Sequence, residues 1–125
     1  MRRSVPGWLV AMVWVAVGAI PGALLRWWLA NLLVANTLGC FVVGASGLLE
    51  TPSTRRRLLV GMGFAGSLTS FSSWVFALLS DLQRGQWADL LGQILRDGVL
   101  GVGALLLGAE AHRRLSRVRA GRLRR

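Results

Sequence analysis

The sequence has few of the residues on which enzymes and disulfide-linked domains depend. It contains one cysteine, Cys40, and one histidine, His112, so a disulfide framework or a His/Cys metal cluster has no candidates, and we expect Cys40 to serve packing. No Ser/His/Asp set is present, and no acidic residue lies in the middle of a membrane segment. Lysine is absent, and fifteen arginines face only five acidic residues. We therefore predict that the chain is not an enzyme.

Long apolar segments dominate the sequence instead. Each of four segments runs for about 19–23 residues, the length at which a helix crosses roughly 30 Å of hydrocarbon. A soluble domain of 125 residues would expose too much of this apolar surface. Tryptophans such as Trp27, Trp28 and Trp87 fall at segment ends, where indole rings favour the membrane interface. The sequence predicts an all-α membrane protein with four transmembrane helices at about residues 7–25, 31–49, 58–80 and 90–110.

The two ends of the chain raise alternatives to this interpretation. Arg2 and Arg3 precede the first apolar segment, as in a signal peptide, but the segment is too long and no small-x-small cleavage site follows it. We therefore expect residues 1–112 to form one four-helix transmembrane domain. The Arg-rich residues 113–125 are expected to be a cytoplasmic tail that sets topology or contacts anionic lipid, in preference to binding nucleic acid.

The arginines are divided unequally between the two sides of the predicted membrane domain. With four spans, both termini and the Glu50–Arg57 connection share one side, which holds twelve arginines. The other side holds Arg26, Arg84 and Arg96. The positive-inside rule then places both termini in the cytoplasm. So large a bias is expected to fix one orientation, whereas a dimer of identical antiparallel copies needs both.

The third apolar segment contains a polar stretch, GFAGSLTSFSSW, at residues 63–74. Any one of its hydroxyls is explained by a bond to the carbonyl four residues earlier. Five hydroxyls within seven residues, beside Gly63 and Gly66, favour a break in the helix. Carbonyls freed by a break would be satisfied by a cation, and freed hydroxyls and amides would offer donors to an anion.

Asn36 in the second apolar segment, and the aromatic pair of the third, each permit two interpretations. The Asn36 side chain either forms an interhelical hydrogen bond, on a helix face of small residues that includes Gly44, or is an amide donor that faces an ion path. Phe71 and Trp74, three residues apart, share a helix face. They are either packing residues or aromatic edges, positively polarised, that face an anion.

The polar stretch resembles the third-helix signature of the Fluc (CrcB) fluoride channels, G-F-x-G-G-x-T-T-F-S-T-F. The family's GAxxR is matched by Gly22, Ala23 and Arg26, and its V-N-x-x-G-x-F-x-x-G by the segment VANTLGCFVVG around Asn36. The order of these motifs agrees with the family over about residues 18–110. The resemblance implies a small dual-pore dimer of two antiparallel subunits, which exports fluoride passively across the bacterial cytoplasmic membrane.

The resemblance also implies roles for single residues. A structural sodium ion, not transported, would be held by the backbone carbonyls of Gly66 and Thr69 at the helix break. Gly22 and Arg26 would form a structural motif. The pore-lining residues implied by the resemblance are Asn36, Phe71, Ser72, Ser73 and Trp74. Membrane lipid would surround the assembly.

Several positions depart from the family pattern. Trp74 stands where the family has a second phenylalanine, Ser67 replaces a glycine, and Ala77 replaces an acidic residue. Together with the arginine bias, these departures favour a heterodimer with an oppositely oriented paralogue, in which one of two pores can decay. A homodimer and a non-conducting partner subunit are the alternatives. A small multidrug exporter is less favoured, because its first helix needs a buried glutamate that is absent here.

Overall fold

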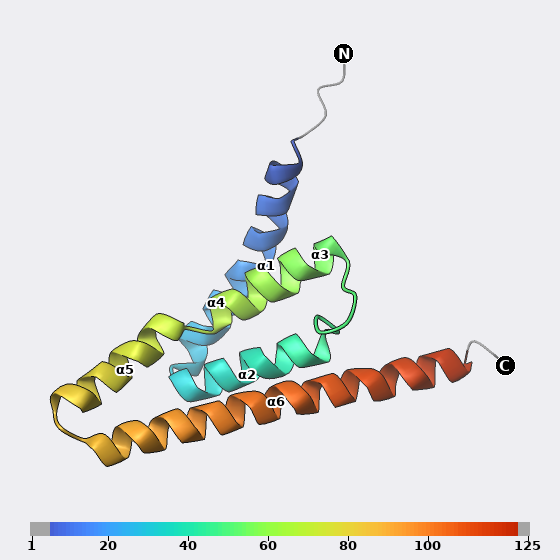
Figure 1. Cartoon of the computed structure of the whole chain (residues 1–125). Helices are drawn as coiled ribbons and strands as arrows, with labels where there is room; N and C mark the ends of the chain where they lie inside the picture. The colour runs from blue at the N-terminus through green and yellow to red at the C-terminus, as the bar shows by residue number, and fades with distance from the viewer. Residues whose placement is uncertain (1–5, 123–125) are drawn as a thin grey trace.

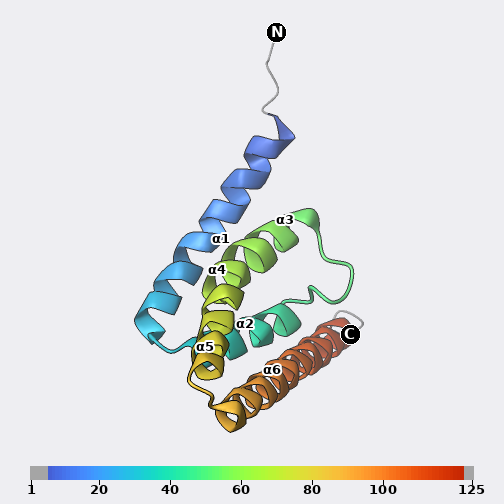
Figure 2. The same cartoon turned by 60° about the vertical axis from the view of Figure 1, so that its left-hand side comes forward.

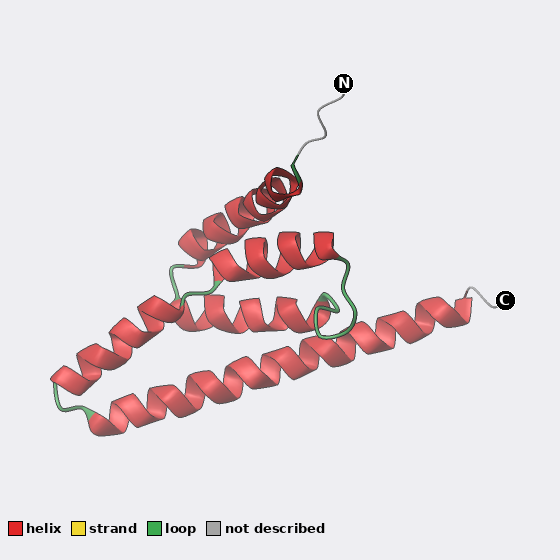
Figure 3. Ribbon diagram, turned by 45° about the horizontal axis from the view of Figure 1, so that its top comes forward, coloured by secondary structure: helices red, strands yellow, loops and turns green. Residues whose placement is uncertain are grey.

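Helices and short connections make up the described fold. The structure, a computed structural model, describes residues 6–122, and within that range there is no strand (Figure 3). The helices in chain order are α1 (Gly7–Leu29), α2 (Leu32–Ala45), α3 (Thr54–Arg56), the π-helical segment η1 (Arg57–Ala65), α4 (Gly66–Leu68), α5 (Phe71–Gln83) and α6 (Trp87–Arg122). The all-α class predicted from the sequence is confirmed for these residues.

Within residues 6–122, three helical segments are long and apolar enough to cross a membrane. They are α1, the segment from Thr54 to Gln83, and α6 as far as Ala120. α2 is also apolar but has only 14 residues, which at 1.5 Å per residue is about 21 Å, less than the roughly 30 Å of a hydrocarbon core. The chain is therefore a multi-pass membrane protein, and α2 is shorter than the predicted second span.

The helices α1 and α2 both end at other residues than the sequence predicted. α1 continues to Leu29 rather than residue 25 and closes at Ala30, whose φ of 48° is left-handed, so Arg26 lies inside the helix. α2 ends at Ala45 rather than residue 49, because Gly47 turns the chain with a φ of 70°. Each helix is ended by a residue with a left-handed backbone inside an apolar run. The length of the run alone does not predict where that residue lies.

The later helices are longer than predicted. The third segment covers Thr54–Gln83 instead of 58–80, and α6 covers Trp87–Arg122 instead of 90–110. Arginine, leucine and alanine are good helix formers, so residues 113–122 continue α6 beyond its apolar part. Arg2, Arg3, Arg124 and Arg125 lie outside the described residues.

The helices lie side by side, with α1 against η1 and α4, and α2 against α6 (Figures 1 and 2). The C-terminal end of α6 and the α2–α3 connection lie toward one end of the molecule (Figure 3). The α1–α2 and α5–α6 connections lie toward the other end. This arrangement groups the connections in the two sets that the arginine count assumes.

Glycines bring the paired helices into close contact. A Cβ atom on Gly18 would collide with the Leu59 carbonyl, which shows how closely α1 meets η1. Between α2 and α6, a Cβ on Gly44 would meet the Leu105 carbonyl and one on Gly108 the Phe41 carbonyl. The expectation that the small-residue face with Gly44 admits another helix is thus confirmed. Small residues at such contacts are the usual basis of helix association in lipid.

We expect Gly108→Ala to destabilise the chain, because the added methyl group must push α6 away from the backbone of α2. The expected cost is about 1–3 kcal/mol in the free energy of unfolding, measured in detergent micelles by thermal or denaturant unfolding. The matched control is Gly92→Ala on the same helix, where nothing lies within 4 Å of the position that a Cβ would take. Equal stability of the two variants would contradict the close α2–α6 contact.

The outer surface of the described chain is apolar and its core is small. Leu68 is fully buried, whereas large apolar side chains on every long helix are exposed, for example Phe76 at 72%. Water would not tolerate so large an exposed apolar area, but lipid tails and a partner helix would cover it. The exposed surface therefore agrees with the membrane assignment.

Candidate functional site

The third apolar segment is interrupted at Thr69 and Ser70. Both residues are extended (φ −86°, ψ 158° and φ −147°, ψ 108°), so α4 ends before them and α5 begins after them. The Thr69 hydroxyl donates to the Ala65 carbonyl at 2.9 Å, and the Ser70 hydroxyl caps α5 by accepting from the Ser73 amide at 3.2 Å. The Ser70 hydroxyl thus replaces a backbone acceptor that the break removes, whereas the Thr69 hydroxyl adds to the bond that the Thr69 amide already makes with the Ala65 carbonyl at 3.0 Å. The predicted break is present, within the GFAGSLTSFSSW stretch.

Asn36 on α2 supplies a partner at the centre of the break. Its Oδ1 accepts from the Ser70 amide at 2.8 Å, although the two residues are 34 positions apart. This is the only hydrogen bond of the Asn36 side chain within residues 6–122, so its Nδ2 remains available as a donor. One half-buried amide therefore joins α2 to the break and keeps N–H groups for a ligand.

Two backbone carbonyls lose their helical partners at the break. In a continuous helix the Gly66 carbonyl would accept from the Ser70 amide, and the Thr69 carbonyl from the Ser73 amide. Both amides are diverted, the first to Asn36 and the second to the Ser70 hydroxyl. Carbonyl oxygens of unwound backbone at membrane depth suit a hard cation such as sodium. The donor chemistry at Gly66 and Thr69 therefore fits the ion that the resemblance implies.

Arg26 reaches the break from α1. Its guanidinium donates to the Thr69 carbonyl at 3.3 Å and to the Ser73 hydroxyl at 2.9 Å, and the side chain is half-buried. Gly22, one turn earlier, permits this approach, because a Cβ there would collide with the Ser67 hydroxyl. Gly22 and Arg26 thus hold α1 against the break, and Arg26 is not the loop residue that the sequence predicted.

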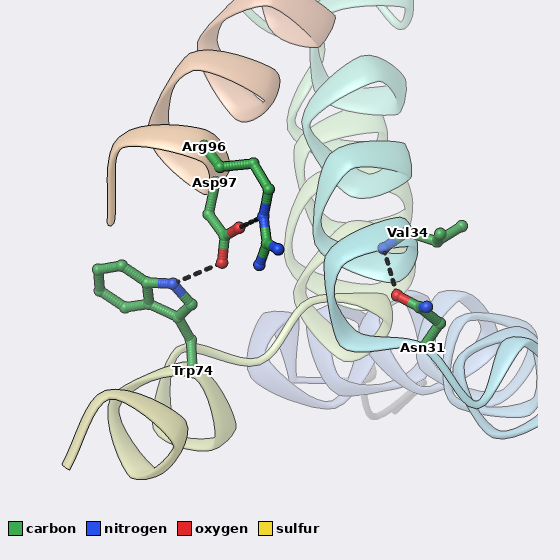
Figure 4. Close-up of polar contacts among 5 residues, drawn as sticks. All are labelled: Asn31, Val34, Trp74, Arg96 and Asp97. Carbon is green, nitrogen blue, oxygen red and sulfur yellow. Dashed lines mark hydrogen bonds and ion pairs between the residues drawn. The ribbon is translucent and has the colours of Figure 1, made fainter. Parts of the chain in front are cut away.

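Phe71 and Trp74 lie at one cavity on the other side of the break. Their ring centroids are 5.7 Å apart and the rings are inclined by 40°. The Trp74 indole N–H donates to Asp97 Oδ2 on α6 at 2.9 Å (Figure 4). A cavity of about 350 Å³ is lined by residues of α2, the break, α5 and α6, among them Asn36, Thr69, Phe71, Trp74 and Asp97. Three of the predicted pore residues are therefore brought together.

Ser72 and Ser73, the other predicted pore residues, do not line this cavity. Ser73 is bonded to Arg26 and accepts from the Ser70 hydroxyl at 2.8 Å. Ser72 is exposed, with its hydroxyl 3.3 Å from that of Ser70. A second cavity of about 580 Å³ lies beside Arg26 and the Ser67 hydroxyl. Hydroxyl groups therefore lie on more than one side of the broken helix.

A family model described as CrcB-like protein, Camphor Resistance (CrcB), matches residues 13–109. The chain belongs to the CrcB family. A protein named fluoride-specific ion channel FluC 2, from Synechococcus sp. (strain CC9605), is 49% identical over 114 residues, which cover 86% of this chain and 84% of the relative. The relatives' names describe channels and not enzymes, in agreement with the expectation from the sequence.

Two CrcB relatives come from one strain, Prochlorococcus marinus (strain MIT 9313). Its fluoride-specific ion channel FluC 2 is 44% identical over 102 residues, 81% of this chain and 77% of the relative. Its FluC 1 is 31% identical over 126 residues, 86% of this chain and 89% of the relative. Two numbered paralogues thus occur together in that strain, and this CrcB chain is more similar to the second.

Asp97 is the residue of this CrcB chain that the sequence reasoning missed. The sequence analysis named no acidic residue as a site candidate, whereas the structure shows that Asp97 lies beside the break and lines the same cavity as Asn36. Its side chain is only 14% exposed, and its Oδ1 accepts from Arg96 Nε at 2.9 Å. The available signal was a charged pair inside the fourth apolar run, which a membrane segment keeps only when its charges find partners.

Proposed function

We propose that this chain is a subunit of a fluoride channel, which lets fluoride leave the cell passively across the cytoplasmic membrane. The observation that carries the proposal is the helix break of a CrcB chain beside the Asn36 amide and the Phe71 ring. Fluoride is small and strongly hydrated, so a selective path must replace its water with closely placed donors. The Asn36 N–H groups, hydroxyls near the break and aromatic ring edges are such donors.

A second subunit is part of the proposal. Phe71 is 75% exposed, and none of residues 71–83 is buried in the single chain. An anion path cannot lie open to lipid along this face, because the path needs polar groups and the lipid excludes them. We assign the covering surface to a partner packed in the opposite orientation.

The arginine distribution supports a partner that is not identical to this chain. The sequence places twelve arginines on the side of the termini and three on the other side, and this bias supports cytoplasmic termini and an oppositely biased paralogue. The two numbered relatives of one strain support the same proposal. A C-terminal reporter found outside the cytoplasm would contradict it.

The test is fluoride efflux from proteoliposomes, followed with a fluoride electrode and with chloride as the control anion. We expect well-folded chain alone to release fluoride at least about tenfold more slowly than the chain reconstituted with its paralogue, and chloride to stay inside in both cases. Fast, selective efflux from the chain alone would establish a homodimer and remove the heterodimer proposal. Absence of fluoride efflux from every combination would remove the channel function itself.

A structural sodium ion is also proposed, held by the carbonyls of Gly66 and Thr69 together with groups of the partner subunit. When bound, the ion would supply a fixed positive charge, satisfy the Gly66 carbonyl that the break frees, and share the Thr69 carbonyl with Arg26. We expect replacement of sodium by N-methyl-D-glucamine during purification to lower the unfolding temperature of the dimer by several degrees. An unfolding temperature independent of sodium would contradict the site.

One observation favours a second function, that of a structural subunit which does not itself conduct. The Trp74 indole N–H is already bound to Asp97, so the aromatic position differs from the family's phenylalanine in more than size. In that case, pore substitutions in this chain would leave efflux through the paired channel unchanged. A multidrug exporter receives no support, since the family match is to CrcB proteins and α1 carries no acidic residue.

A further inference from the structure

α5 presents the aromatic pair of the proposed path but has few attachments within its own chain. None of its residues is buried. Across residues 6–122, a single side-chain hydrogen bond joins α5 to α6, between the Trp74 indole and Asp97 Oδ2 (Figure 4). Trp74 lies in the first turn of α5, so this bond holds the start of α5, next to the break, against α6.

An ionised carboxylate in a membrane segment costs free energy unless it has partners, and Asp97 lies in such a segment. Each of its oxygens has one. Oδ1 accepts from Arg96 Nε at 2.9 Å, and Oδ2 accepts from the Trp74 indole at 2.9 Å. The Arg96 side chain is 54% exposed, so its charge offsets the carboxylate from the outer side, while Trp74 covers the side toward α5. The carboxylate is thus held by groups of its own chain.

The bond also determines what Trp74 offers to the cavity. An indole has one N–H and no acceptor, so the N–H that binds Asp97 is not free to bind an anion. Trp74 therefore offers only its ring to the cavity, and the centroid of that ring is 5.7 Å from the centroid of the Phe71 ring. A phenylalanine at position 74 would present a similar edge but could not be held by a carboxylate.

We propose that Asp97 is a positioning residue for the anion path. By holding the Trp74 indole it fixes the angle between Trp74 and Phe71 and ties α5 to α6. The inference rests on the proposed fluoride function, since its effect on transport requires that fluoride passes the aromatic pair.

The test compares Asp97→Asn, Asp97→Ala, Trp74→Phe and the double variant Trp74→Phe/Asp97→Ala, with Asp89→Ala on the exposed first turn of α6 as the matched control. Fluoride efflux is measured in whichever assembly conducts. We expect Asp97→Ala to slow efflux about tenfold, the effect of one lost hydrogen bond to a charged group. Asp97→Asn should stay within about threefold of the original rate, because its amide oxygen still accepts from the indole.

The double variant separates positioning from a direct effect of the carboxylate. If Asp97 acts through Trp74, the double variant is no slower than the slower of its two single variants, and the two effects do not multiply. Multiplying effects, or faster efflux in Asp97→Asn than in the original chain, would show that the carboxylate acts on the anion itself and would overturn the proposal.

A second readout does not depend on transport. With ¹⁵N-labelled indoles, the Trp74 N–H resonance is assigned by its loss in Trp74→Phe. We expect that resonance to shift in Asp97→Ala and to stay in place in Asp89→Ala. An unshifted resonance would overturn the bond, whereas a shift in protein that releases no fluoride in any assembly would leave the bond and remove the channel function.

Discussion

Asn36→Ala is expected to lower fluoride efflux by about 100-fold or more while the dimer still assembles. The substitution removes two things at once, the N–H donors proposed to replace water around fluoride and the oxygen that accepts from the Ser70 amide at 2.8 Å. A backbone amide left without a partner at membrane depth costs about 1–3 kcal/mol, and a rate loss of 100-fold corresponds to about 2.7 kcal/mol. Efflux from proteoliposomes and size-exclusion chromatography measure the two effects separately.

Asn36→Asp separates the structural role of Asn36 from its role in the path. A carboxylate still accepts from the Ser70 amide but has no N–H donor and repels anions, so assembly should persist and efflux should stay blocked. The matched control is Asn31→Ala, since Asn31 is an asparagine at the start of α2 whose side chain only caps the helix, accepting from the Val34 amide at 3.0 Å (Figure 4). Unchanged efflux in Asn36→Ala would show that the amide serves packing alone.

Arg26→Gln is expected to produce the second large loss, at least about tenfold in efflux. The half-buried guanidinium joins α1 to the break through the Thr69 carbonyl and the Ser73 hydroxyl, and it brings a positive charge to that site. A glutamine is shorter and neutral, so both contacts and the charge are lost. Arg26→Lys keeps the charge without the two-point contact and should give an intermediate rate. Efflux and thermal unfolding of the same preparations measure the effect.

Arg84→Gln is the control for Arg26, because Arg84 is exposed in the α5–α6 connection. Its substitution should leave the efflux rate within about twofold of the original rate, since an exposed arginine far from the break contributes only a screened charge. Equal losses in the two variants would point to a general effect of positive charge. No loss in Arg26→Gln would mean that the contacts at the break are dispensable.

Composition and motif spacing predicted the helical class, the membrane assignment and the break. Those features follow from local properties, namely apolar run length, hydroxyl and glycine content, and the absence of charge at most positions. Helix ends were less predictable, because Ala30 and Gly47 close their helices by a left-handed backbone inside apolar sequence. The second span was misjudged for this reason, since an apolar run of sufficient length contains a helix of only 14 residues.

The candidate site shows the same division. Asn36, Phe71 and Trp74 were marked in the sequence by the resemblance to the family, whereas the residues alone left packing as an alternative. The bonds from Trp74 to Asp97 and from Arg26 to Ser73 could not be predicted in this way, since they span 23 and 47 positions and depend on how α6 and α1 pack against the break. The sequence placed Arg26 outside the first predicted span and gave Asp97 no role, whereas Arg26 contacts the break and Asp97 lines the cavity beside it.

By itself the sequence determined that this is a helical membrane protein of the CrcB type with a polar break in its third apolar segment. Hydropathy and local propensity act over a few turns of helix, so they can be read directly from the chain. Only the tertiary structure decided which groups satisfy the break, because the amides of Ser70 and Ser73 had several possible acceptors. Glycine contacts set how closely α1 and α2 approach the broken helix, and that approach lets Asn36 accept from the Ser70 amide and Arg26 donate to the Thr69 carbonyl.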